Sequence, residues 1–542
     1  SKIANMKSLR FLIIIIYCVI LNIPTNPQIS TSAAEIGRLE LNRAEPNQDI
    51  AQILQQTLSK SASLCTPLPP PTGPTITVST ESELREQAYN APTGTTILIT
   101  PGIYKMGSYM HIVNSGLALR GGSGDRDDVV LDFGGMLNGH FGILIDADDV
   151  TIADLTIRNA HDHAVSVQGK DRPILYNLHI MDARDQLVKV NPAGDGSEDG
   201  LLACSRLEYT TSSPDDYTNG ISAHQAHRWN LRDNQWYRIR GSNGSTGPTI
   251  LLWSGSTDTI VERNLIVDSY RGIAFGNPSH NVVDHTGGIV RNNMIYFSLE
   301  HDVAIEMTHA QEWLVAHNTA LLTNPSAGLS WGMEARYPDS QGTFAYNLTN
   351  MDIWEDRDGA HGNLVGNLTN AQSSWFVDPT NADLHLLPSA TSAIDQADTL
   401  ANVNDDFDGN SRPISLAPDI GADELGDVAS PRSAVTDLQV SGFLIFDAIQ
   451  ATLTWTPPTE AVTTTIRFAY THISENNWEA ANLLTGTLPG HTDTFSTTIP
   501  YAEDMVFIAL KTQSATGEWS SLSNNAYWPQ QKTWLPIILN TH

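Results

Sequence analysis

Short apolar strands separated by turn residues repeat along the chain from Ile76 to about Leu387. Apolar and polar positions alternate within the strands, whereas long amphipathic helical patterns are scarce. The best matching strands are Ala164–Val167, Leu187–Val190, Gly220–Ala223, Thr249–Leu252, Gly272–Phe275 and Val303–Glu306. This recurrence predicts an all-β fold in which parallel strands stack from one coil to the next.

Asparagine recurs between these strands in similar contexts. The eight positions are Asn159, Asn177, Asn234, Asn264, Asn293, Asn318, Asn347 and Asn367. From Asn234 onward, successive asparagines lie 20 to 30 residues apart, which is the length of one solenoid coil. Asparagine tolerates left-handed backbone, and its amide can bond both its own turn and the asparagine one coil away. We therefore expect these asparagines to stack along one turn of the solenoid.

Residues 75–425 resemble the right-handed parallel β-helix proteins of the pectate-lyase-like superfamily. Two phrases add to the likeness, Asp405–Pro413 (DDFDGNSRP) and Pro418–Glu424 (PDIGADE), which are similar to a closing motif common after such β-helices. The resemblance implies the fold. It leaves the chemistry open, because this superfamily includes lyases, hydrolases, epimerases and non-catalytic adhesins.

The N-terminal segment has the pattern of a targeting sequence. A basic stretch, Met6–Arg10, precedes the apolar run Phe11–Ile23, and small residues follow at Thr31–Ala33. We predict a signal peptide over residues 1–33, with an N-terminal anchor helix as the alternative. Residues 34–74 are polar and end in a proline run, which is typical of a leader or linker.

A second domain is predicted after a linker over residues 426–434. Residues 435–528 resemble a fibronectin type III β-sandwich, with Trp455 as the core tryptophan of a strand and Gly517–Ser520 turning into the last strand. The tail 529–542 is apolar but too short to span a membrane. It is interpreted as a sorting or cell-surface attachment signal, or as a final strand.

Charge and cysteine content narrow the possible partners. Acidic residues outnumber basic ones 60 to 30, a net charge of −30 that repels nucleic acid and anionic membranes. The same field would repel a polyanionic polysaccharide, so such a substrate requires local Lys or Arg side chains or bound cations. Outside the apolar run only Cys65 and Cys204 remain, too few for a disulfide framework and without metal-ligand spacing.

The strand alternation predicts an outward stripe of polar and aromatic side chains. With the apolar pairs pointing inward, the column after them contains Gln168, Asn191, His224, Trp253, Gly276 and Glu306, beside Lys189, Ser222, Leu251, Ala274 and Ala304. The next coil adds Glu334 and Arg336. Such a stripe predicts a carbohydrate groove, in which Trp253 stacks on a sugar and Asn191 helps to bind it. The alternative is that the loops 192–217 or 277–286 cover the stripe.

The chemistry that we favour is that of a polysaccharide lyase acting on a uronic-acid-containing glycan. β-Elimination needs a base, for which Lys189 is the first candidate and His224 the second. In the alternative, Lys189 only pairs with Asp185 or Asp182, and His224 makes an ordinary turn hydrogen bond. Positive charge for the uronate carboxylate would come from Arg336, Arg240 or Arg271, or from a Ca²⁺ ion. The candidate calcium ligands are Asp302, Glu306, Glu334 and Asn293.

Two other functions fit the same pattern. A glycoside hydrolase would use Glu306 and Glu334, one coil apart, as its pair of carboxylates. A secreted or cell-surface adhesin would use the stripe only to bind polysaccharide. Proximity of Lys189, His224, Glu306 and Arg336 in an open groove favours an enzyme, whereas scattered or covered positions favour the adhesin.

Overall fold

The computed structural model describes most of the chain between Leu64 and Trp528. The described ranges are 64–324, 328–425, 434–445, 448–458, 461–484, 487–500, 505–513 and 519–528. The predicted signal peptide (1–33) and the tail (529–542) lie outside the described residues, as does most of the linker 426–434. No helix in the described ranges combines the length and apolar character needed to cross a membrane.

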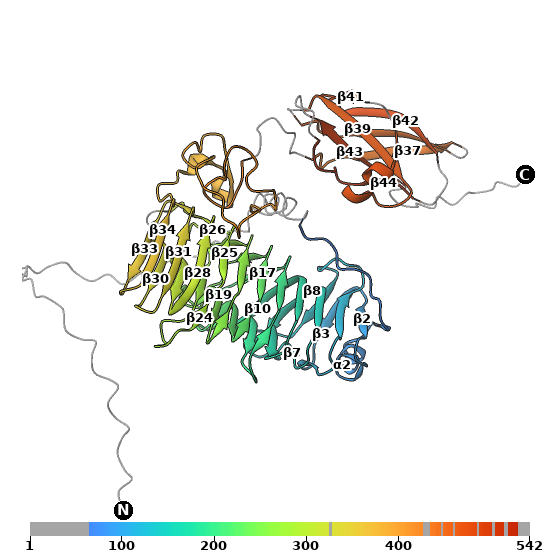
Figure 1. Cartoon of the computed structure of the whole chain (residues 1–542). Coiled ribbons are helices and arrows are strands. Elements are labelled where there is room, and N and C mark those ends of the chain that lie inside the picture. The colour runs from blue at the N-terminus through green and yellow to red at the C-terminus, as the bar shows by residue number, and fades with distance from the viewer. Residues whose placement is uncertain are drawn as a thin grey trace, which may run out of the picture. The chain divides into compact units, whose positions relative to one another are not determined.

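Residues 75–365 form a right-handed parallel β-helix, which confirms the predicted all-β solenoid (Figure 1). One of its sheets has ten strands, one from each successive coil. In chain order they are β4 (Met110–Ile112), β7 (Ile143–Ile145), β9 (Val165–Gln168), β11 (Gln186–Asn191), β15 (Asn219–His224), β19 (Pro248–Trp253), β23 (Arg271–Phe275), β27 (His301–Thr308), β30 (Gly328–Arg336) and β33 (Asp352–Arg357). Apolar side chains from its inner face pack into one long core, since period-2 alternation sends every second residue inward.

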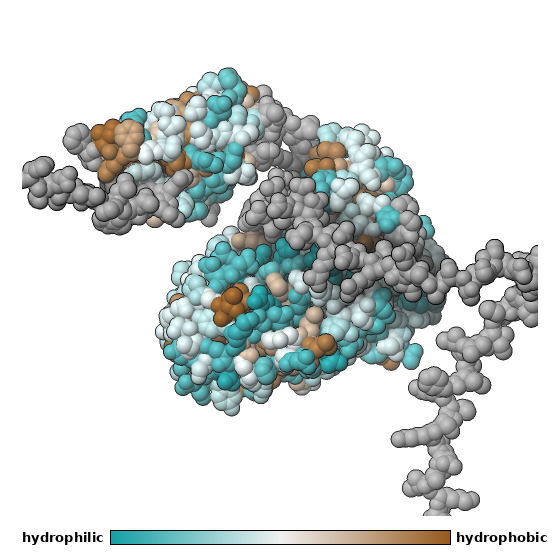
Figure 2. Space-filling view, turned by 180° about the vertical axis from the view of Figure 1, so that it is seen from behind, coloured by the Kyte–Doolittle hydropathy of each residue, from teal (hydrophilic) through white to brown (hydrophobic). Residues whose placement is uncertain are grey.

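The rest of each coil contributes to a second parallel sheet of 24 short strands. These are β1 (Thr75–Val78), β2 (Thr96–Ile99), β3 (Gly102–Lys105), β5 (Ala118–Gly121), β6 (Val129–Asp132), β8 (Thr151–Ala160), β10 (Ile174–Ala183), β12 (Ser197–Glu198), β13 (Leu201–Ala203), β14 (Arg206–Glu208), β16 (Ala226–His227), β17 (Asn230–Arg232), β18 (Gln235–Tyr237), β20 (Ser256–Thr257), β21 (Ile260–Glu262), β22 (Leu265–Val267), β24 (His285–Thr286), β25 (Ile289–Arg291), β26 (Met294–Phe297), β28 (Ala310–Ala316), β29 (Thr319–Leu322), β31 (Gln341–Ala345), β32 (Leu348–Thr349) and β34 (His361–Val365). On the side seen in Figure 2 the β-helix surface is mainly hydrophilic, with only small apolar patches.

A short helix, α2 (Glu81–Asn90), covers the N-terminal end of the solenoid (Figure 1). Thr80 and Glu83 form a capping box at its start, which satisfies backbone N–H groups of the first turn. Its buried face, Leu84 and Ala88, packs into the main core. The helix thereby shields apolar residues that a solenoid end would otherwise expose.

The predicted asparagine stack is confirmed for six of the eight positions. Each ladder amide donates from Nδ2 to the Oδ1 atom of the next asparagine, over 2.8 to 3.1 Å, in the order Asn234, Asn264, Asn293, Asn318, Asn347 and Asn367. The left-handed residue is the one before each asparagine, for example Arg263 with φ 50°. Asn159 and Asn177 lie outside this ladder: their own φ values are positive, and their amides bond other turns.

Replacing Asn293 with alanine is expected to lower the free energy of unfolding by about 1 to 3 kcal/mol, because it leaves buried amide and carbonyl groups without partners. Nδ2 of Asn293 has three acceptors within hydrogen-bond distance, among them the buried carbonyl of Val261 at 2.9 Å. Urea unfolding would measure the change. Asn370, an exposed asparagine, gives the matched control; equal effects of Asn293→Ala and Asn370→Ala would contradict a stabilising ladder.

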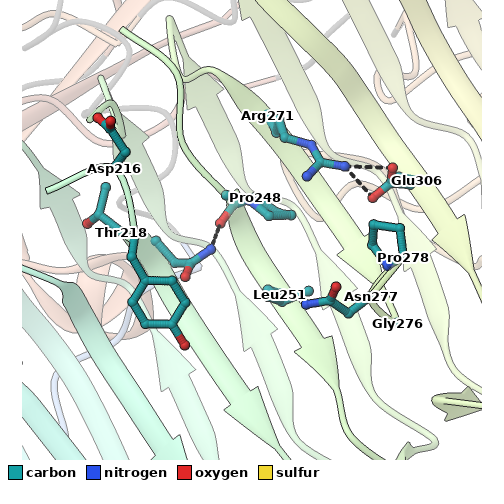
Figure 3. A pocket seen from close by; sticks show the side chains of 12 residues that line it. Asp216, Thr218, Pro248, Leu251, Arg271, Gly276, Asn277, Pro278 and Glu306 are labelled. Carbon is teal, nitrogen blue, oxygen red and sulfur yellow. Dashed lines mark hydrogen bonds and ion pairs between the residues drawn. The ribbon is translucent and has the colours of Figure 1, made fainter. Parts of the chain in front are cut away.

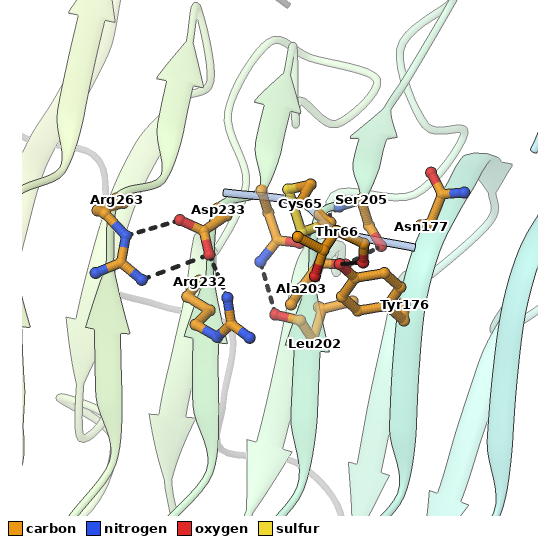
Figure 4. Close-up of a disulfide and its surroundings, with 12 residues drawn as sticks. Cys65, Thr66, Tyr176, Asn177, Leu202, Ala203, Ser205, Arg232, Asp233 and Arg263 are labelled. Atoms are coloured by element: carbon orange, nitrogen blue, oxygen red, sulfur yellow. Dashed lines mark hydrogen bonds and ion pairs between the residues drawn. A yellow bond between two sulfur atoms is a disulfide. The ribbon is translucent and has the colours of Figure 1, made fainter. Parts of the chain in front are cut away.

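A disulfide fastens the segment before the β-helix to its surface (Figure 4). Cys65 and Cys204 are bonded, with their Cα atoms 5.6 Å apart; two cysteines are too few for a disulfide framework, but they form this one bond, which was not predicted from the sequence. The Tyr176 hydroxyl donates to the carbonyl of Thr66 over 2.6 Å beside the bond. The stretch from Leu64, assigned from sequence to the linker 34–74, therefore packs on the β-helix.

The closing phrases belong to a separate lobe. Residues 371–425, which we call the closing lobe, contain the hairpin of β35 (Phe376–Asp378) and β36 (Asp383–Leu386) and two 3-10 turns, η1 (Ser373–Trp375) and η2 (Pro379–Asn381). Its apolar residues share a core with outward residues of the 24-stranded sheet. The solenoid coils thus end near β34, and the predicted range 75–425 includes both the β-helix and this lobe.

The C-terminal region is an antiparallel β-sandwich. One sheet contains β37 (Gln439–Ile445), β38 (Ala448–Thr454) and β42 (Thr494–Pro500); the other contains β39 (Thr463–Ala469), β40 (Asn482–Leu483), β41 (Leu488–Pro489), β43 (Val506–Gln513) and β44 (Ala526–Trp528), and η3 (Glu475–Ala480) lies between strands. Trp455 is buried in the core that the two sheets share. The closer assignment to the fibronectin type III family stays a prediction.

Candidate functional site

The outward face of the ten-stranded sheet has two columns of side chains. Strand pairing places in one column, which we call the lysine column, Ser166, Lys189, Ser222, Leu251, Ala274, Glu306, Glu334 and Trp354. The second column includes the pairs Gln168 with Asn191, His224 with Trp253, and Thr308 with Arg336.

The predicted position of Glu306 needs correction. It was placed in the column of Trp253 and Gly276, but it pairs with Ala274 and Glu334 in the lysine column. The cause is the length of β27, which starts earlier than its neighbours. Its inward residues equivalent to Ile273 and Phe275 are Ile305 and Met307, so the shift is by two residues and keeps Glu306 on the outward face.

Lys189 lies in the middle of a small polar network. Its Nζ atom donates to Ser222 Oγ over 3.1 Å and lies 2.9 Å from His224 Nε2. Burial lowers the pKa of Lys189 to about 8, although Asp185 opposes the change. Burial and the charge of Lys189 lower the pKa of His224 to about 4. His224 is therefore neutral at physiological pH, and its Nε2 atom can accept a hydrogen bond from Lys189 Nζ.

Trp253 is fixed beside this network. Its indole Nε1 donates to Ser222 Oγ over 3.2 Å, and its ring contacts those of His224 and His280 at centroid distances of 4.3 and 5.0 Å. His280 is anchored in turn by Asp284, at 2.7 Å. The loop 277–286 thus buttresses the tryptophan, which remains partly exposed.

A pocket opens farther along the same face (Figure 3). Its volume is ≈ 170 Å³, and it is lined by Asp216, Tyr217, Thr218, Asn219, Gly247, Pro248, Leu251, Arg271, Gly276, Asn277, Pro278 and Glu306. Gly276 has a φ of 79°, and a Cβ atom there would lie 1.7 Å from the carbonyl oxygen of Thr308. Glycine is therefore required where the chain turns from β23 into the pocket wall.

The predicted acidic and basic residues of the stripe are paired with one another. Arg271 donates to both oxygens of Glu306 at 2.6 Å, and its Nε atom lies 3.2 Å from Asp302 Oδ2. Arg357, which the sequence did not single out, binds Glu334. Burial and the neighbouring Glu306 raise the pKa of Glu334, although Arg357 opposes this. These carboxylates thus already have cationic partners.

Two predicted arginines have other partners. Arg336 pairs with Asp358 at 2.7 Å, at the edge of the second column. Arg240 donates to the backbone carbonyls of Asp268 and Gly244, both at 2.8 Å. We therefore regard Arg240 as a turn-stabilising residue, and among the predicted arginines only Arg271 lines the pocket.

The predicted calcium ligands do not form a ligand set. Asn293 is buried in the asparagine ladder, where its amide is fully bonded, and this corrects its assignment as a ligand. The other three candidates already form ion pairs with Arg271 or Arg357: Asp302, Glu306 and Glu334. A cation would have to displace these arginine side chains. The four residues therefore do not fit a Ca²⁺ ion.

A different group of oxygen donors lies at the turns that precede β9, β11 and β15. Burial raises the pKa of Asp185, and the negative charges of Asp162 and Asp215 raise it further. Arg184 is 3.5 Å from Asp215 and 3.8 Å from Asp185, and so offsets part of their charge. Sequence reasoning missed this group because its members come from three separate turns without a contiguous motif.

Trp354 at the far end of the lysine column was also missed. Its side chain is 41% exposed, and its ring lies 5.2 Å from that of Trp331. The guanidinium of Arg357 stacks on Trp331 at 4.0 Å. An exposed aromatic face beside a cation suits a sugar ring. The signal in the sequence was the phrase Asp352–Arg357, whose alternation places Trp354 outward.

Comparison with known proteins finds remote similarity to solved structures only. No protein-family model matches the chain, and no curated protein matches it. Among solved structures, pectate lyase Pel9A is 12% identical with a TM-score of 0.47, covering 68% of this chain and 99% of that one. An alginate lyase from Paenibacillus sp. str. FPU-7 is 13% identical (TM-score 0.34; 53% and 99% covered). The catalytic unit of a GH87 alpha-1,3-glucanase from Streptomyces thermodiastaticus strain HF3-3 is 14% identical (TM-score 0.33; 57% and 70% covered).

Proposed function

We propose that this chain is a secreted or cell-surface polysaccharide lyase that cleaves a uronic-acid-containing glycan on the outward face of the ten-stranded sheet. The observation that supports this most is Lys189. It is a buried lysine with a pKa of about 8 that contacts a serine and a neutral histidine. An amine with such a pKa is partly unprotonated near neutral pH, and it stands on a rigid strand.

In the proposed reaction the neutral amine of Lys189 removes the C5 proton of the uronate. The electron pair forms the C4–C5 double bond, the C4–O bond breaks, and the leaving oxygen takes a proton from water. Ser222 and His224 hold Nζ in place through their bonds of 3.1 and 2.9 Å. Trp253 offers an aromatic face for a neighbouring sugar, and Asn191 is close by, bonded to Ser166 at 3.2 Å.

Positive charge on the uronate carboxylate acidifies the C5 proton. A Ca²⁺ ion near Asp162, Asp185 and Asp215 would supply this charge, since Ca²⁺ binds oxygen donors of this kind. The ligand atoms of these three carboxylates do not all lie within 4.8 Å of one another, so the side chains would have to move to hold the ion. The bound cation would withdraw electron density from the substrate carboxylate. It would also offset part of the net negative charge of the chain, which otherwise repels a polyanionic substrate. Arg271 at the pocket is the alternative source of positive charge.

A glycoside hydrolase is the second candidate, favoured by one observation. Glu306 and Glu334 are paired neighbours on adjacent coils, and burial raises the pKa of Glu334. A carboxyl group with a raised pKa suits a general acid, and coils stack at about 4.8 Å, near the separation that retaining glycosidases use. The bonds to Arg271 and Arg357 argue against this role, because they favour the ionised forms.

The test is an activity panel on the full chain. The protein is incubated with uronate polysaccharides and neutral glycans, with and without Ca²⁺, while ultraviolet absorbance and reducing ends are followed. Absorbance of an unsaturated uronate supports the lyase. Reducing ends without absorbance support the hydrolase and contradict our proposal, and binding without either product supports an adhesin.

Trp354→Ala is expected to weaken binding of long glycan chains about tenfold, because loss of one stacked ring costs about 1 to 1.5 kcal/mol. Trp354 lies six positions from Lys189 in the lysine column, so the binding of short oligosaccharides at Lys189 should be unaffected. Isothermal titration with long and short chains measures the difference. Trp519→Ala removes a similarly exposed ring, 47% exposed, from the β-sandwich; an equal loss in both variants would contradict a subsite at Trp354.

A further inference from the structure

The closing lobe contains a cluster of metal-ligating side chains that the groove chemistry does not use. His385, on β36, and Asp408 and Asp423, from the two closing phrases, each have a ligand atom within 4.8 Å of the others. In the described part of the chain this is the one group of histidine, cysteine and acidic residues with that geometry. His385 and Asp423 are buried, at 5% and 2% exposure.

The histidine ring is oriented as metal-binding histidines are. Its Nδ1 atom bonds Asp383 Oδ1 at 2.5 Å, and its Nε2 atom lies 3.1 Å from Asp408 Oδ2. In metal sites the ring nitrogen that does not bind the ion almost always donates to a carboxylate or a carbonyl. Asp383 therefore has the position of the residue that fixes the tautomer, and Nε2 points toward the other two carboxylates.

Negative charge is in excess around this histidine. Six carboxylates lie in the same part of the lobe: Asp383, Asp406, Asp408, Asp419, Asp423 and Glu424. Arg412 is bonded to Glu424 at 2.6 Å. Buried charge is costly unless it is paired or bound to a metal.

Backbone hydrogen bonds position two of the candidate ligands, Asp408 and Asp423. Asp406 accepts from the backbone N–H groups of Asp408 and Asn410, at 3.0 and 2.7 Å, and so shapes the loop that presents Asp408. Asp423 uses Oδ2 to accept from Leu386 N–H at 2.7 Å, which positions its side chain beside β36. Backbone bonds thus preorganise two of the carboxylates.

We propose that His385, Asp408 and Asp423 bind one divalent metal ion, Zn²⁺ or Mn²⁺, that locks the closing lobe. A mixed set of imidazole nitrogen and carboxylate oxygen suits these ions, whereas Ca²⁺ takes oxygen ligands. The alternative occupant of His385 Nε2 is a proton. A divalent ion supplies two positive charges where the proton supplies one, and it joins β36 to both closing phrases.

The site would stabilise the lobe and, through it, the edge of the β-helix. Next to Asp423, the Ala422 N–H group donates to Thr319 Oγ1 at 2.9 Å, and Asn292 donates to the carbonyl of Asp405 at 2.8 Å. A metal that orders the closing phrases therefore also orders their contacts with the coils. This role is independent of the proposed lyase activity.

The experiment uses the full chain, stripped with a chelator and dialysed into metal-free buffer. Titration with ZnCl₂ or MnCl₂ by calorimetry, followed by gel filtration and elemental analysis, gives affinity and stoichiometry. We expect one tightly held ion per chain and a higher Tm with the ion than without it. His385→Gln and Asp408→Asn should each weaken binding at least tenfold.

His309→Gln is the matched control. His309 is also buried and bonded through Nδ1 to a carboxylate, Asp339, at 2.7 Å, but its ring stacks on Tyr337. It should keep the full stoichiometry. A wild-type chain that retains neither ion would overturn the proposal whatever the variants do. Retention that is unchanged in folded His385→Gln protein would overturn it as well.

Discussion

Lys189→Ala is expected to reduce kcat for glycan cleavage about 10³-fold, within the range of 10²- to 10⁴-fold that general-base catalysis contributes. The alanine variant loses the amine that we assign to C5 proton removal, while Ser222, His224 and Trp253 keep their strands. Initial rates of absorbance increase on the best substrate of the panel would measure the effect. Lys170, whose Nζ atom pairs with Asp146 at 3.2 Å on a nearby turn, provides the control, since Lys170→Ala should cleave at the wild-type rate.

The pH profile tests the same assignment by its sign. Because the base is the neutral amine, the rate should rise with pH and level off above the lysine pKa of about 8. His224 stays neutral throughout this window, since its pKa is lowered to about 4. Lys189→Arg keeps a cation without a usable base and should remain inactive at every pH. A wild-type rate that falls between pH 7 and 9, or an active arginine variant, would contradict Lys189 as the base.

The fold was predictable because its signals repeat. A β-helix needs the same solution in every coil, so asparagines such as Asn264 and Asn293 recur at coil spacing and inward residues such as Val188 recur at period two. Because the same pattern recurs in every coil, a strand misassigned in one coil does not change the predicted fold. The outward position of Lys189 followed directly from its apolar neighbours and needed no knowledge of side-chain contacts.

The rest depended on contacts that no spacing records. Cys65 and Cys204 are 139 residues apart in sequence, so their approach follows only from the three-dimensional path of the chain. The column of Glu306 depended on where β27 begins, and its charge depended on Arg271, which comes from another coil. Sequence alternation therefore fixes which face a residue lies on, but neither its partner nor its neighbour along the groove.

The closing phrases show the same limit in another form. Their resemblance to a common motif predicted the end of the β-helix but not the reason for the acidic residues within them. In the structure Asp405 reaches back to Arg263, at 2.5 Å, and Asp419 accepts through its carbonyl from Arg412 at 2.8 Å. The motif is thus a set of internal bonds that fold the lobe onto the coils, and Arg412 is its centre.

Arg412→Leu is therefore expected to destabilise the chain by about 3 to 5 kcal/mol, as removal of one partner from a buried ion pair does. The Arg412 side chain is 1% exposed and bonds Glu424 at 2.6 Å. It also donates to the carbonyls of Asp405, Asp419, Gly421 and Ala422 at 2.8 to 3.2 Å. Leucine fills part of the space but leaves these acceptors and the Glu424 carboxylate buried without their donor.

Urea unfolding, with limited proteolysis of residues 371–425 as a local probe, measures this loss. Arg172→Leu is the control, because Arg172 forms an exposed pair with Asp149 and such pairs add little stability. Arg412→Met combined with Glu424→Gln should recover part of the loss, since it removes the uncompensated charge as well as its partner. If Arg412→Leu unfolds at the same urea concentration as Arg172→Leu, the buried pair does not hold the lobe. The stability of the closing phrases must then come from their apolar contacts with the coils.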